Sequence, residues 1–249
     1  CCDDGSGHSL DTIELGNVLA KTKKTIGRPL DVLGMDACLM SNLEVAYQAA
    51  PYASYLVSSE EVEPGEGWPY EDILKVLTKT PGTPPADLVG KVVKAYIDYY
   101  KSAGESGVTQ SAFNLAKVQD AVKSVDALGE ALLGHMPRAA DEILKAQKRT
   151  VAFFENKLWD LSQFSGELAK GSSDQDVKKA AKAVRTALKP GAKNFVLSKS
   201  EFGSKLTPCG GISIYMMPPT YTLSRYYADL AMIRDYPNWQ KMLQKYLSV

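Results

Sequence analysis

Apolar residues recur along the chain first at helical spacing and then in short continuous runs. After a Gly/Asp-rich turn at residues 3–7, Leu15, Val18, Leu19 and Ile26 predict a helix that is capped by Ser9 and ended by Gly27. Residues 30–35 and 55–59 are typical of buried strands, and a helical pattern from Leu39 to Ala50 separates them. This alternation predicts an α/β fold in which helices cover both faces of a mainly parallel sheet.

The remaining chain continues the alternation without an internal repeat or a low-complexity linker. We expect residues 1–249 to form one domain. Further strands are predicted at 109–115, 195–198 and 212–216, and further helices around 70–79, 85–102, 117–155 with a break near Pro137, 174–189, 221–233 and 238–247.

Composition narrows the function classes. The chain is 45% hydrophobic, and its 29 Lys and Arg residues balance 29 Asp and Glu residues, which argues against general binding to nucleic acid or to a membrane surface. No apolar run approaches the roughly 20 residues that cross a bilayer. Four cysteines and two histidines are too few for a disulfide scaffold or a zinc site. The basic face of helix 174–189 is interpreted as a solvated surface (Lys178, Lys182, Arg185 and Lys189).

Cys38 is the sharpest catalytic candidate. It directly follows the predicted strand at 30–35, and ligands of such sheets bind beyond the carboxyl ends of the strands. A helix starting there would place backbone N–H groups and a positive helix end near the sulfur, which favours a nucleophilic thiolate and could hold an oxyanion. The alternative is a small buried cysteine without chemistry.

Acidic residues surround this candidate. Asp36 would point to the same side as Cys38 and suits a cationic substrate group, although Asp is also a good helix N-cap. The loop after the second strand adds Glu60, Glu61, Glu63 and Glu66, of which we select Glu60 and Glu66 as substrate-binding residues. An acidic pocket would select Arg or Lys, whereas the alternative is a solvated acidic loop.

Neither histidine is an evident partner for Cys38. His8 lies next to the turn at residues 3–7, and His135 lies in a predicted helix beside Pro137, so both are interpreted as surface residues. The sequence starts at Cys1 without an initiator Met, so a catalytic partner could lie on a missing piece, and if Cys38 is catalytic we expect its histidine outside these 249 residues.

Several blocks of this sequence closely resemble the clostripain family of cysteine peptidases. They are Asp3–Gly7, Leu30–Met40, Glu44–Tyr47, Tyr55–Glu61, Pro64–Tyr70 and Gly211–Tyr215, and Trp239 with Leu243 adds weaker support. The Asp-Ala-Cys-Leu-Met block together with the downstream Ser-Glu-Glu and Gly-Trp residues is the specific part of the resemblance.

The resemblance implies a caspase-like α/β/α fold and an endopeptidase that cuts after Arg or Lys. Cys38 matches the nucleophile, and Asp36 matches the acid that shapes the pocket for the basic side chain. Family members are secreted or surface-bound bacterial enzymes, commonly made as zymogens that cut themselves into a light chain, which carries the histidine, and a heavy chain like this one. Some depend on calcium, although the turn at residues 3–7 has only weak calcium-loop character.

Two function classes follow from these observations. The first is a cysteine endopeptidase whose partners are peptides with Arg or Lys and its own light chain. The alternative is a non-catalytic pseudo-peptidase domain that binds basic peptides, which the lack of a matching histidine supports. A scaffold domain without peptide binding is a more distant third.

Overall fold

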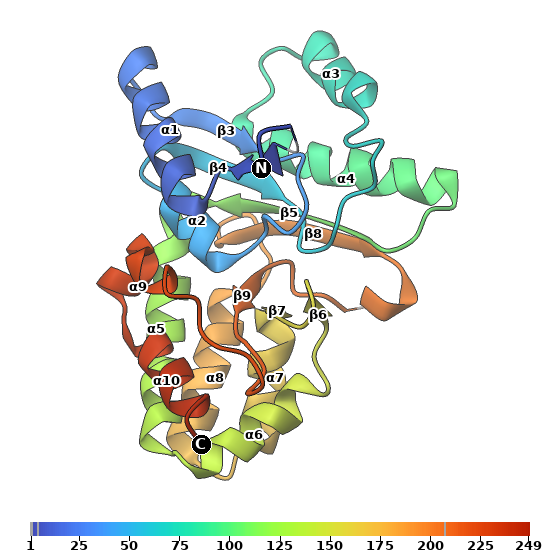
Figure 1. Cartoon of the computed structure of the whole chain (residues 1–249). Coiled ribbons are helices and arrows are strands. Elements are labelled where there is room, and N and C mark those ends of the chain that lie inside the picture. Colours follow the sequence, from blue (N-terminus) through green and yellow to red (C-terminus); the bar gives the residue numbers. More distant parts are fainter. Residues whose placement is uncertain (1, 4, 207) are drawn as a thin grey trace.

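One part of the molecule, in the upper half of Figure 1, is built around a four-stranded sheet. The structure is a computed structural model that describes residues 2–3, 5–206 and 208–249. The sheet has the order β3-β4-β5-β8, with β3 at Leu30–Gly34, β4 at Ala53–Ser58, β5 at Val108–Asn114 and β8 at Val196–Phe202. The α/β fold predicted from the sequence is confirmed.

The strand pairing is more mixed than a mainly parallel sheet implies. Only β3 and β4 pair in parallel, and β5 is antiparallel to both of its neighbours. Three of the four strands therefore run in one direction, with β5 inserted against them. The carboxyl ends of β3 and β4 still meet at one edge of the sheet, as the sequence predicts.

Helices cover both faces of this sheet. The alternation of side chains along a strand sends Leu56 and Phe113 into the larger core, and their neighbours Val57 and Ala112 into a smaller one. The smaller core packs against α3 (Tyr70–Lys79) and α4 (Pro85–Ala103). The larger core packs against α1 (Thr12–Ile26), α2 (Leu43–Ala49) and α5 (Val118–Gly134).

The other part of the molecule, in the lower half of Figure 1, adds a small sheet and further helices around the same larger core. The three-stranded sheet has the order β6-β7-β9, and a single bridge between Asn42 and Ser213 links it to the start of α2. The remaining elements are β6 (Ala152–Phe153), β7 (Leu158–Asp160), β9 (Ser213–Tyr215), α6 (Arg138–Gln147), α7 (Leu161–Gly171), α8 (Gln175–Ala187), α9 (Ala231–Asp235), α10 (Asn238–Tyr246), the hairpin β1 (Cys2–Asp3) and β2 (His8–Ser9), and three short 3-10 turns. Within the described residues, no helix is both long and apolar enough to cross a membrane.

Several predicted boundaries are wrong. Asp11, not Ser9, caps α1, because its side chain and that of Glu14 form a reciprocal capping box, whereas Gly27 ends the helix as predicted. Residues 148–155 are not helical, and α6 ends at Gln147. The stretch at 221–233 contains only a 3-10 turn and the start of α9, and α7 with its preceding strand was not predicted.

Candidate active site

The loop between β4 and α3, residues 59–69, wraps around the end of β3. Thr109 of β5 anchors it, because the Thr109 hydroxyl accepts hydrogen bonds from the N–H groups of Glu60 and Glu61 at 3.0 and 3.1 Å. The N–H of Leu39 in turn donates to the Glu61 carbonyl at 3.3 Å. The loop is thereby fixed against the turn that carries Cys38.

Cys38 is an exposed free cysteine in that turn, just beyond the carboxyl end of β3. The Glu63 N–H points at its sulfur, with 3.3 Å between N and Sγ. The N–H of Cys38 itself has no acceptor within the described residues. One residue therefore offers both an exposed thiol and a free N–H, and an N–H in such a position can stabilise an oxyanion.

The predicted helix start at Cys38 is wrong. Helix α2 begins at Leu43, and Asn42 caps it by accepting a hydrogen bond from the Val45 N–H at 2.9 Å. Cys38 therefore does not lie in the first turn of a helix, where the positive end of the helix dipole acts most strongly. The same observation excludes Asp36 as the cap of this helix.

Asp36 is instead held by the loop after β4. Its carboxylate accepts hydrogen bonds from the Trp68 N–H at 3.2 Å and from the Tyr70 hydroxyl at 2.8 Å. Gly67 allows this close approach, since a Cβ there would lie 2.8 Å from an Asp36 oxygen and its φ is +67°. The Trp68 ring lies against Gly34 of β3, where a Cβ would be 3.0 Å away. Asp36 stays exposed and carries a fixed orientation.

Glu63 joins Asp36 to Cys38. Its carboxyl group is buried, accepts hydrogen bonds from the Trp68 indole N–H at 3.2 Å and the Gln110 amide at 3.3 Å, and hydrogen-bonds Asp36. Burial, followed by the bond to Asp36, raises the pKa of Glu63 to about 8. At neutral pH Glu63 thus holds a proton, which it can donate in its hydrogen bond to Asp36.

The wall behind this pair is aromatic. Tyr100 of α4 donates a hydrogen bond from its hydroxyl to the Gly67 carbonyl at 2.7 Å. Tyr96, one turn earlier, is fully buried, and its hydroxyl has no partner among the described residues. Burial raises the pKa of Tyr96, and charge interactions with Glu63 and Tyr100 add to the increase. The hydroxyl therefore stays protonated close to the acidic pair.

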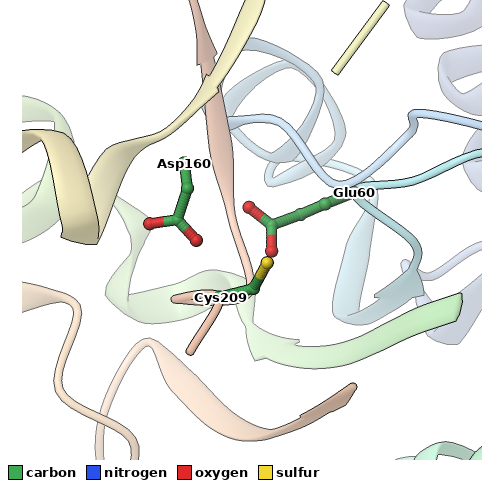
Figure 2. A group of neighbouring side chains, drawn as sticks. All are labelled: Glu60, Asp160 and Cys209. Carbon is green, nitrogen blue, oxygen red and sulfur yellow. The ribbon is translucent and has the colours of Figure 1, made fainter. Parts of the chain in front are cut away.

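The two glutamates that were selected from the sequence as substrate-binding residues differ in exposure. Glu66 is exposed on the same loop, near enough to Tyr100 for its charge to raise the pKa of that residue. Glu60 is fully buried and accepts a hydrogen bond from the Gly211 N–H at 2.9 Å. Figure 2 shows its carboxyl group facing Asp160 and Cys209. Glu60 is therefore not available to a substrate in this arrangement, and Glu63 takes its place beside Cys38.

The buried group of Glu60, Asp160 and Cys209 also tests the calcium that the sequence resemblance suggests. Their ligand atoms lie within 4.8 Å of one another. Calcium takes about six to eight oxygen ligands, but this group offers one sulfur and two carboxyl groups. Each carboxyl group already accepts a hydrogen bond from a backbone N–H, Asp160 from Gly210 and Glu60 from Gly211. Burial raises the pKa of both carboxyl groups, and Lys199 lies close enough to oppose that increase. These residues do not fit calcium. The acids of the turn at 3–7 lie outside the described side chains.

Within the described residues, neither histidine forms a hydrogen bond with Cys38. His135 ends α5 and lies 3.4 Å from a Glu142 carboxylate oxygen and 3.6 Å from one of Asp174. His8 is exposed in the β1–β2 hairpin, where its N–H donates to Ser6. The histidine that a thiol nucleophile needs is thus not found next to Cys38 within the described residues.

An exposed thiol beyond a strand end of an α/β fold, with a free N–H and two carboxyl groups beside it, is an arrangement that suits the nucleophile of a cysteine peptidase. The sequence profile of the clostripain family, peptidase C11, matches residues 1–246, and the chain belongs to this family of cysteine peptidases. Its fold is caspase-like, as the sequence resemblance implies.

Solved structures show the same fold at low sequence identity. A cysteine protease from B. fragilis is 19% identical with a TM-score of 0.67, and the match covers 96% of this chain and 97% of that one. A clostripain from Bacteroides thetaiotaomicron, in complex with the peptide inhibitor BTN-VLTK-AOMK, is 15% identical with a TM-score of 0.68 and coverages of 96% and 98%. An inactive zymogen C11 protease from Parabacteroides distasonis is 20% identical with a TM-score of 0.63 and coverages of 90% and 61%. No curated protein matches the chain.

Proposed function

We propose that this chain is the heavy-chain part of an endopeptidase that cleaves peptide bonds after Arg or Lys. The observation that carries the proposal is the position of Glu63, whose N–H contacts the Cys38 sulfur while its carboxyl group hydrogen-bonds Asp36. Nucleophile and anionic pocket are thereby joined through one residue. A substrate with a basic side chain against Asp36 would place its adjacent carbonyl near the thiol.

The chemistry is acyl transfer. The Cys38 thiolate attacks the carbonyl carbon, a C–S bond forms, and the N–H of Cys38 stabilises the oxyanion. The C–N bond breaks as a histidine donates a proton to the leaving amine. Water then hydrolyses the thioester, which releases the carboxylate product and restores the thiol. The energy for specificity comes from pairing the substrate cation with the Asp36 carboxylate, with Glu66 adding to the field.

The histidine is proposed to come from a light chain cut from the same precursor. This agrees with the carboxylate contacts of His135 and with the coverage of known structures, since the chain matches 97% of the B. fragilis protease but 61% of the P. distasonis zymogen. Residues 1–249 would then form one peptidase domain with that light chain, and a cut at a basic residue would activate it.

Two further features are carried over from relatives as proposals. The inhibitor of the B. thetaiotaomicron clostripain ends its peptide with K before the AOMK group, which agrees with a basic specificity here. Another B. thetaiotaomicron relative is described as a secreted C11 cysteine protease, and we propose secretion from a bacterium for this protein as well.

The direct test is cleavage by the full precursor and its Cys38→Ala variant. We expect Cys38→Ala to abolish both the hydrolysis of Arg and Lys peptides and the maturation of the precursor. Cys209→Ala is the control, because that buried cysteine lies outside the site, and it should mature and cut normally. A Cys38→Ala protein that still cut these peptides would refute the proposal.

A further inference from the structure

A cavity of about 1030 Å³ lies between α7, α8 and the segment around Pro208, outside the Cys38 site. Its lining holds one carboxylate, Glu167, against six cationic side chains, namely Arg149, Lys170, Lys182, Arg185, Lys189 and Lys199. The whole chain has a formal net charge of zero, so this concentration of one sign in one hollow is a local feature. We call it the basic cavity.

Half of these cations have no ionic partner within the described residues. Glu167 serves both Lys170 at 2.8 Å and Arg149 at 3.6 Å, and Glu201 serves Lys199 at 3.1 Å. No ion pair is formed by the other three, which are Lys182, Arg185 and Lys189. Like charges that converge on a hollow without counter-charges repel one another, and an anionic ligand relieves that repulsion.

The local packing directs these side chains to the cavity. Gly166 of α7 is buried, and the Arg185 Nε lies 3.4 Å from where its Cβ would be, so the arginine side chain crosses α7 at a residue without a side chain. Lys182 and Arg185 are three residues apart on α8 and therefore share one face of the helix. The basic stripe of this helix is consequently not simply a solvated surface, because part of it lines a hollow.

We propose that the basic cavity binds an acidic peptide segment, with Lys182, Arg185 and Lys189 pairing with Asp or Glu carboxylates. The lining includes apolar residues that suit a peptide (Val151, Leu188, Pro190 and Pro208). Among the described residues, no aromatic side chain lines the cavity for stacking of nucleic-acid bases. The choice of a peptide over another polyanion rests on the proposed peptidase function. A protein substrate would thus be held by an acidic segment here, apart from its basic residue at Asp36.

Binding can be measured without catalysis on a Cys38→Ala enzyme assembled from separately expressed light and heavy chains, because this variant is not expected to mature by itself. The probe is a fluorescein-labelled peptide of Glu and Gly, compared with the same peptide carrying Gln in place of Glu, by fluorescence anisotropy. We expect the Glu peptide to bind, and the double change Lys182→Glu and Arg185→Glu to weaken binding at least roughly tenfold. Lys178→Glu with Lys179→Glu is the matched control on α8 outside the lining, and it should weaken binding less than about twofold.

Equal binding of the Gln peptide, or equal weakening by both double variants, would overturn the inference, because either result means attraction without a site. Binding of a sulfated oligosaccharide but not of the Glu peptide would also overturn it. Since the readout needs no turnover, these outcomes are distinguishable from a failure of the proposed peptidase function. All four substituted residues are exposed or half-buried. An unchanged temperature of thermal unfolding would verify that both double variants are folded.

Discussion

Asp36 is the residue that we propose to determine specificity, and its carboxylate is held in one orientation. It is exposed, yet two donors, the Trp68 N–H and the Tyr70 hydroxyl, fix its carboxylate. A carboxylate whose orientation is already set loses little entropy when it pairs with a substrate cation. Under the proposed function, this preorganisation would let a single surface acid set the preference for a basic side chain.

Replacing Asp36 with Asn should therefore affect substrate use more than folding. Asn keeps an oxygen that accepts hydrogen bonds from Trp68 and Tyr70, but it removes the charge. We expect kcat/KM for Arg and Lys peptides to fall about 10- to 100-fold, mostly through KM, with little change in melting temperature. Asp31→Asn, an exposed surface acid paired with Arg28, is the control. A large loss of stability with specificity intact would show that Asp36 is structural only.

Glu63 makes binding of basic ligands depend on pH. Its pKa of about 8 lies well above the ordinary 4.5 of a glutamate, so the folded protein keeps this carboxyl protonated at neutral pH and loses the proton as the pH rises through 8. Ionisation adds negative charge to the pocket. On the Cys38→Ala enzyme, we expect affinity for agmatine, a guanidinium ligand, to increase between pH 7 and pH 9.

The Glu63→Gln variant isolates this effect. The substitution removes the ionisable carboxyl group, so the affinity of this variant for agmatine should be nearly constant between pH 7 and pH 9, as measured by calorimetry. The same rise with pH in Glu63→Gln would mean that another group titrates and that Glu63 does not control the charge.

The sequence selects Cys38 and Asp36 as candidates, because their order after a strand is a local pattern. It cannot choose among the four glutamates of the following loop. Glu60 turns into the protein toward Gly211, whereas Glu63 turns toward Cys38, and this depends on how Thr109 of a distant strand anchors the loop. No signal within the loop encodes that course.

At the scale of elements, helix α5 shows how closely the larger core is packed. Gly129 lies against α10, where a Cβ would come within 2.7 Å of the Trp239 backbone nitrogen. Gly134, in the last turn of the same helix, has nothing within 4 Å of that position. The two glycines are therefore a matched pair for testing the contact between α5 and α10.

Gly129→Ala should lower the free energy of unfolding by about 1–3 kcal/mol, because backbone of α10 must move to admit the methyl group. Gly134→Ala should be close to neutral. Urea denaturation followed by circular dichroism measures both variants. Equal stabilities would show that α5 and α10 are less tightly packed than the structure indicates.

Elements with strong periodicity and clear stops are predictable from the sequence, as α1, α3, α4 and α8 show. Those that fail depend on contacts elsewhere in the chain. The start of α2 is set by the Asn42 cap, while Leu39 before it adopts a φ of +67°, which no apolar pattern reveals. The short β7 that precedes α7 is specified by its pairing with β9, far along the chain.

At the scale of the whole molecule, a neutral net charge conceals two regions of opposite sign. The Cys38 site is acidic, and the basic cavity concentrates cations between α7 and α8. Total charge therefore says nothing about local recognition, because charge distribution is a property of the fold.

Activity should belong to the assembled enzyme rather than to this chain alone. We expect the purified 249-residue chain to show no hydrolysis of Arg or Lys peptides, because no histidine contacts Cys38 in its described part. The precursor, once cut, should be active, and changing the proposed histidine of its upstream segment to Ala should remove that activity. Full activity of the isolated chain would contradict a light-chain histidine.

The central claim, that Cys38 is the nucleophile of a protease for basic residues, is tested most directly by covalent labelling. The mature enzyme is treated with a peptidyl chloromethyl ketone carrying Lys or Arg, and the modified residue is mapped by mass spectrometry. We predict labelling of Cys38, none with a matched probe carrying Glu, and strong reduction by Asp36→Asn. If Cys38 stays unmodified under reducing conditions, with and without calcium, the claim is contradicted and a non-catalytic peptide-binding domain is the better account.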